Sequence, residues 1–141
     1  MHSNLDKLCG PTKPLRPEPP DAVEYQGLIR SGMARLADAA KPDLSLESRF
    51  DLAYNAAHAL SLAALRRRGY RPSQRYIVFQ VIPETLGLGP EVWRVLAMCH
   101  DLRNRSKYEG DLRIDARVVT DLLSACQKIA KTLATLKSTP P

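Results

Sequence analysis

The chain has 141 residues, with 21 Lys and Arg against 15 Asp and Glu, so its formal net charge is +6 at pH 7. This length is typical of one domain that buries a core without disulfide bonds. The three cysteines lie far apart and form no CxxC pair, which argues against a disulfide framework and a zinc site. Because no apolar leader and no run of about 18 apolar residues occurs, we expect a cytoplasmic protein without a membrane span.

The beginning of the chain is rich in proline, which fixes the backbone and interrupts helices. Few apolar residues accompany these prolines, so little in the segment could anchor it to a core. We therefore predict a flexible proline-rich tail over residues 1–20, followed by one helical domain over residues 21–137. The prolines of the tail are Pro11, Pro14, Pro17, Pro19 and Pro20.

Two long helices are predicted next, over residues 22–40 and 46–68. Asp21 and Ser45 precede them and are residue types that cap helix N-termini. Apolar residues recur at helical spacing in the first of them, and the second is rich in alanine and leucine up to Gly69. Because small side chains let neighbouring helices approach closely, we expect the second helix at the centre of a bundle.

The second half of the domain predicts three more helices. Residues 76–82 have the β-branched and aromatic composition of a strand. No second strand-like run is available to pair with them, so we predict a short helix over residues 73–86, disturbed at its proline. Helices over 90–107 and 114–136 follow, the latter with apolar residues at alternating spacings of three and four. The predicted fold is an all-α, five-helix up-and-down bundle.

Basic residues gather in two parts of the chain. Such clusters suit contacts with the phosphates of RNA. The alternative interpretation is a pair of solvated helix ends, where cations oppose the negative end of the helix dipole. The residues that we predict to bind RNA are Arg66, Arg67, Arg68 and Arg71 in the first cluster, which extends to Arg75, and Arg105 and Lys107 in the second.

Only one stretch, residues 100–110, combines strongly polar side chains with a predicted helix end. Neither a glycine-rich phosphate loop nor a nucleophile elbow nor a cluster with metal-ligand spacing is found in the sequence. On a helix, His100, Arg103, Asn104 and Lys107 share one face, because residues three and four positions apart are neighbours. That face could hold a phosphate and stabilise the charge of its transition state. Alternatively, the stretch is a solvent-exposed helix surface with ion pairs.

The stretch resembles the HEPN family of small helical proteins from prokaryotic toxin–antitoxin and defence systems. The hallmark of that family is an Arg, commonly followed by Asn, and a His four to six residues later. Arg103 and Asn104 match its start, and Tyr108 stands where the shortest form of the motif has histidine. The alanine-rich run over residues 50–65 is similar to the early helix of the family.

This resemblance implies an endoribonuclease that cleaves RNA without metal or other cofactor, at the cleft of a homodimer. Arg103, Asn104 and Tyr108 would be its catalytic residues, with His100 and His58 as auxiliary groups. Tyrosine is a poor base at pH 7 because its ordinary pKa is near 10. The alternative is therefore a non-catalytic HEPN module that binds a nucleotide, RNA, or a cognate antitoxin or nucleotidyltransferase.

DNA binding is a third interpretation, because the arginines at 66–75 precede a short helix as in a helix-turn-helix. The stretch in the place of a recognition helix, residues 76–82, is mostly apolar. It offers few side chains that could read base edges, so this interpretation is disfavoured.

Overall fold

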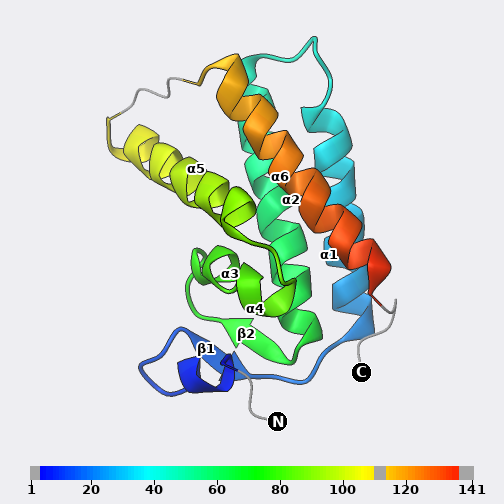
Figure 1. The fold of residues 1–141 in the computed structure, drawn as a ribbon, viewed down its shortest axis with the longest axis vertical. Coiled ribbons are helices and arrows are strands. Elements are labelled where there is room, and N and C mark those ends of the chain that lie inside the picture. Colours follow the sequence, from blue (N-terminus) through cyan, green and yellow to red (C-terminus); the bar gives the residue numbers. More distant parts are fainter. Residues whose placement is uncertain (1–3, 110–113, 137–141) are drawn as a thin grey trace.

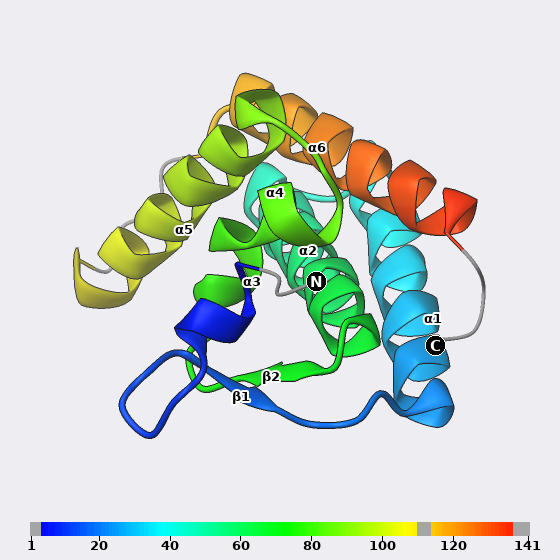
Figure 2. The same cartoon turned by 60° about the horizontal axis from the view of Figure 1, so that its bottom comes forward.

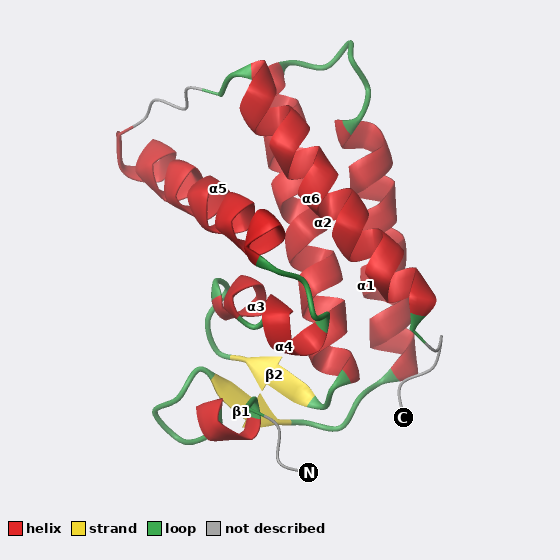
Figure 3. Cartoon of the chain, viewed as in Figure 1, coloured by secondary structure: helices red, strands yellow, loops and turns green. Residues whose placement is uncertain are grey.

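The computed structural model describes residues 4–109 and 114–136, with side chains for 4–105 and 114–136 (Figure 1). Helices dominate these residues, and one small sheet joins them (Figure 3). None of the described helices has both the length and the apolar character that crossing a membrane requires. The elements in chain order are η1 (Asp6–Leu8), β1 (Leu15–Pro17), α1 (Ala22–Ala39), α2 (Leu46–Arg67), β2 (Tyr70–Pro72), α3 (Ile77–Gln80), α4 (Ile82–Thr85), α5 (Pro90–Glu109) and α6 (Ala116–Thr135).

The four long helices begin and end within two residues of their predicted bounds. Asp21 caps α1, since its carboxylate accepts hydrogen bonds from the backbone N–H groups of Val23 and Glu24. Ser45 caps α2 by accepting from the N–H of Ser48. These bonds satisfy N–H groups that the first turn of a helix leaves without partners.

Helix α2 lies at the centre of the molecule, as the alanine content predicts, with α1 and α6 packed against it (Figure 2). Its alanines are almost completely buried. Gly32 of α1 allows a close approach, because a Cβ atom there would lie only 2.8 Å from the side chain of Leu60. The core of the fold is therefore built around the small-residue surface of α2.

Helix α5 departs from the predicted five-helix up-and-down bundle. It packs mainly on α6 and diverges from the bundle axis, so that α5 and α6 form two sides of a wedge over α2 (Figure 2). The predicted short helix is two single turns, α3 and α4, which meet at Val81, and Pro83 lies in the first turn of α4. Residues 77–80 and 82–85 are thus helical, as predicted, while the regular bundle is not seen.

The N-terminal segment also differs from the expected flexible tail. β1 pairs in antiparallel fashion with β2, with Leu15 opposite Pro72 (Figure 3). Leu5 and Leu15 are both buried in the core, 0% and 1% exposed. Two apolar anchors and a short strand pair help to hold residues 4–20 against the helices, although the prolines prevent a helix there.

Candidate functional site

Polar and aromatic side chains from three parts of the chain meet where α5 passes the middle of α2. Helix α5 contributes His100, Arg103 and Asn104, and α2 contributes Tyr54. The segment between β2 and α3 adds the cation of Arg75 and, at its end, the ring of Tyr76. We call these six residues the His100 cluster.

His100 is held by contacts on both ring nitrogens and on one face. Its Nδ1 lies 2.9 Å from the hydroxyl oxygen of Tyr54, and its Nε2 lies 3.0 Å from the amide nitrogen of Asn104. Because that amide nitrogen can only donate, Nε2 acts as the acceptor and Nδ1 of the neutral ring carries the proton. The ring of Tyr76 stacks on the imidazole, with centroids 4.1 Å apart and planes 16° apart. The histidine is therefore fixed in one orientation and one tautomer.

Two arginines flank the buried ring of Tyr54. The guanidinium carbon of Arg103 lies 4.7 Å from the ring centroid, and that of Arg75 lies 6.0 Å from it. Arg75 also donates to the amide oxygen of Asn55 at 2.8 Å, and Arg103 lies 4.0 Å from a carboxylate oxygen of Asp51. Two cations thus converge on one aromatic ring, an arrangement that favours an anion beside it.

The cationic surroundings alter the proton affinities of the cluster. Burial lowers the pKa of His100, and the positive charges of Arg103 and Arg75 lower it further, against a raising effect of Asp101. Burial raises the pKa of the Tyr54 hydroxyl, although the two arginines oppose that effect. At neutral pH the site therefore combines a neutral imidazole and a neutral phenol with two positive charges.

The other auxiliary histidine lies deeper. The imidazole of His58 packs edge-on against Phe79, with centroids 6.1 Å apart. Burial lowers the pKa of His58 to about 4, and the charges of Arg75 and Arg103 contribute to the shift. His58 is thus a neutral group that contacts Phe79, whose ring in turn packs against Tyr54 and Tyr76.

The predicted arginine cluster at 66–71 is divided between the interior and the surface. Arg66 is only 2% exposed and binds the carboxylate of Glu24 at 2.7 Å, and Arg71 binds Glu18 at 2.6 Å and Glu24 at 2.8 Å. The prediction that Arg66 binds RNA is corrected accordingly, since this side chain is buried and its charge is used in internal ion pairs. Arg71 belongs to the same ion-pair network but is 27% exposed, so its contact with RNA stays a prediction. Arg67 is half-buried, and Arg68 is exposed and donates to a backbone carbonyl of α4.

The polar stretch at the end of α5 is described by the structure only up to the side chain of Arg105. Asn104 and His100, four positions apart, are joined as the helical spacing predicts. Arg105 is exposed on α5. The side chains of Lys107 and Tyr108 lie outside the described part of the structure, so the predicted role of Tyr108 is not addressed by it. Tyr54 and Tyr76 are not predicted as site residues from the sequence, because nothing local indicates that they approach α5.

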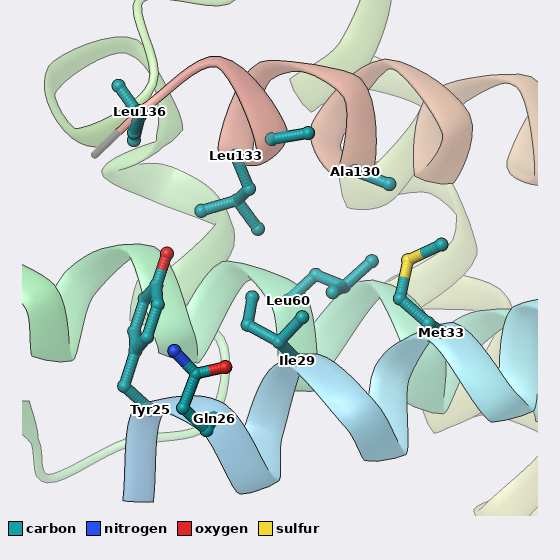
Figure 4. Close-up of a pocket in the computed structure, with 9 residues that line it drawn as sticks. Tyr25, Gln26, Ile29, Met33, Leu60, Ala130, Leu133 and Leu136 are labelled. Atoms are coloured by element: carbon teal, nitrogen blue, oxygen red, sulfur yellow. The ribbon is translucent and has the colours of Figure 1, made fainter. Parts of the chain in front are cut away.

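A separate apolar groove lies between α1 and α6 (Figure 4), and none of its lining residues belongs to α5. Its volume is about 280 Å³, and Tyr25 and Gln26 supply the polar groups at one end (Figure 4). The remaining lining is mostly aliphatic, so the groove has no part in the chemistry of the His100 cluster. In the described parts of the chain, no three His, Cys, Asp or Glu side chains are grouped to hold a metal ion.

Comparison of the chain with protein-family models, with curated proteins and with solved structures gives no match. The geometry of the His100 cluster and the short motif at Arg103 and Asn104 are therefore the features of the chain that bear on its function.

Proposed function

We propose that this chain is a HEPN-like, RNA-acting protein that cleaves RNA without a metal ion, as a toxin or defence ribonuclease. The observation that supports the proposal is the meeting of Arg103, Arg75 and a fixed, neutral His100 around Tyr54. Arginine binds phosphate oxygens in a bidentate manner, and two of them can compensate the growing charge of a phosphorane. As in the HEPN family, two copies would form the cleft.

In the proposed reaction, the 2′-hydroxyl of RNA takes the place of the Asn104 amide at Nε2 of His100. Nε2 accepts the 2′-hydroxyl proton while the 2′-oxygen forms a bond to phosphorus. The bond from phosphorus to the 5′-oxygen breaks, and that oxygen takes a proton from a water molecule. The resulting hydroxide then takes the proton from Nε2, which restores neutral His100. The products are a 2′,3′-cyclic phosphate and a 5′-hydroxyl.

The contacts of His100 support the role of general base. Its lowered pKa keeps the ring unprotonated at pH 7, as a base requires. The bond between Nδ1 and Tyr54 presents Nε2 toward the exposed side of α5, where Asn104 now occupies it. The displaced Asn104 amide can then donate to a phosphate oxygen, and Arg103 neutralises that phosphate.

The second candidate is a non-catalytic module that binds RNA, a nucleotide or a protein partner at the same cluster. It is favoured by the engagement of both ring nitrogens of His100, since Asn104 must move before Nε2 can accept a proton. An antitoxin or nucleotidyltransferase is the protein partner that the family resemblance suggests.

The test compares wild type, Arg103→Ala and Arg117→Ala on end-labelled RNA in EDTA. Arg117 is a suitable control because it is 89% exposed on α6 and pairs only weakly with Asp121, at 3.9 Å. We expect cleavage by the wild type and by Arg117→Ala, and at least a hundredfold loss in Arg103→Ala, whose fold circular dichroism would verify. Equal cleavage by folded Arg103→Ala would refute the assignment, and RNA binding without cleavage by any protein would favour the second candidate.

A further inference from the structure

An aromatic cleft lies directly beside the His100 cluster. Its volume is about 330 Å³, and its walls come from the segment of α3 and α4 and from the start of α5. A cleft of this size suits a nucleobase with part of its ribose. It is lined by Tyr76, Phe79, Gln80, Pro83 and Trp93.

Tyr76 connects this cleft to the candidate site. The same ring that lines the cleft stacks on His100, with centroids 4.1 Å apart. It is also held edge-on by Phe79, at a centroid distance of 6.3 Å, so its orientation is set by the core. A planar group stacked on Tyr76 from the side of the cleft would consequently be separated only by that ring from the imidazole that we assign to proton transfer.

The chemistry of the walls matches a base rather than an aliphatic group. Tyr76 and Trp93 supply aromatic faces, on which any base can stack. Gln80 is exposed and carries both a donor and an acceptor, as the edge of a base requires. Arg94 places its guanidinium carbon 5.6 Å from the centroid of the Trp93 ring, which brings a positive charge close to the cleft.

We infer that the cleft between Tyr76 and Trp93 is the subsite for the nucleobase next to the phosphate that the His100 cluster holds. Tyr76 and Trp93 stack on the base, whichever base it is, and Gln80 forms a hydrogen bond with its edge. The inference rests on the proposed function for the position of the phosphate, but it makes a claim about base binding that can be tested alone.

Trp93 gives a direct readout, because it is the only tryptophan in the chain. The probes are adenosine 5′-monophosphate and ribose 5-phosphate, which share the phosphate and differ in the base. Tryptophan emission is excited at the red edge of its absorption, where adenine does not absorb. We expect adenosine 5′-monophosphate to quench the emission saturably and ribose 5-phosphate to leave it unchanged. Gln80→Ala should weaken the binding of the nucleotide about fivefold, as expected for a lost hydrogen bond.

Met98→Ala is the control variant. Met98 lies on α5, as Trp93 does, and is a 41% exposed apolar residue that does not line the cleft. It should bind the nucleotide as the wild type does. In a separate assay, Trp93→Ala should weaken the binding of short RNA about tenfold, as loss of one stacking partner predicts.

The outcomes separate this inference from the proposed function. Absence of quenching, or equal quenching by both probes, overturns the base subsite even if Arg103-dependent RNA cleavage is observed. Quenching by the nucleotide alone, with weaker binding in Gln80→Ala, supports the subsite. This holds even if no RNA is cut: the proposed ribonuclease activity then fails, and the nucleotide site stands.

Discussion

Replacement of Arg66 by methionine should destabilise the protein strongly, because this side chain joins the N-terminal segment to α1 and α2. Its guanidinium donates to Glu24 at 2.7 Å and to the backbone carbonyls of Glu18, Pro19 and Tyr70 at 2.9, 2.7 and 3.2 Å. The side chain itself is 2% exposed. Methionine would preserve most of the apolar stem and remove every one of these bonds.

Removing one partner from a buried ion pair costs about 3–5 kcal/mol. The lower end applies to Arg66, because Glu24 is 29% exposed and still pairs with Arg71, so water and Arg71 can compensate part of the loss. With a urea m value of about 2 kcal/mol/M, a loss of about 3 kcal/mol lowers the unfolding midpoint by about 1.5 M. Arg68→Met, at the same helix end but exposed, should change stability by no more than about 0.5 kcal/mol.

The pH dependence provides a second measurement of the same network. Burial would raise the pKa of Glu24, but hydrogen bonds from Arg66 and Arg71 outweigh it and lower that pKa below 4.5. The stabilisation from Glu24 is therefore present above pH 4.5 and is lost as the pH falls through the folded-state pKa. Arg66→Met should lose less stability over that interval than the wild type. A urea midpoint of Arg66→Met within 0.3 M of the wild-type midpoint at neutral pH (about 0.6 kcal/mol) would refute the stabilising role of Arg66.

Three further predictions concern the site and the N-terminal segment. Tyr54→Phe should keep the fold, at a cost of about 1 kcal/mol in the free energy of unfolding. Because it removes the hydroxyl that contacts Nδ1 of His100, ¹⁵N NMR of His100 should show loss of the Nδ1–H tautomer that we expect in the wild type. The lowered pKa of His58 should make the wild type lose stability as the pH falls from 6.5 to about 4, since the unfolded chain binds the proton first. His58→Gln should flatten the free energy of unfolding over this pH interval. Leu15→Ala should cost about 2–4 kcal/mol in urea unfolding, whereas a loose tail would make the substitution neutral.

The long helices could be predicted from the sequence because their signals are local. The caps at Asp21 and Ser45 lie one residue before the helices that they start. The pairing of β1 with β2 could not be predicted, since it joins three-residue strands that are more than fifty residues apart and each contain a proline. Pairing over such a distance depends on how the helices between the strands pack, and short strands carry almost no periodicity of their own.

The site could be predicted only in part for the same reason. Helical spacing places His100 beside Asn104 on α5, and the structure confirms that contact. The approach of Tyr54 to His100 spans 46 positions and depends on the crossing of α5 over α2. Charge alone was misleading at Arg66, because a run of arginines does not reveal which of them is turned into the core.

The measurement that tests the central claim most directly compares RNA with its fully 2′-O-methylated counterpart, incubated with the wild-type protein in EDTA. If His100 takes a proton from the 2′-hydroxyl, RNA should be cut to fragments with a 2′,3′-cyclic phosphate and a 5′-hydroxyl. The methylated strand should bind but stay intact. Cleavage of both strands, or of neither, would contradict the account.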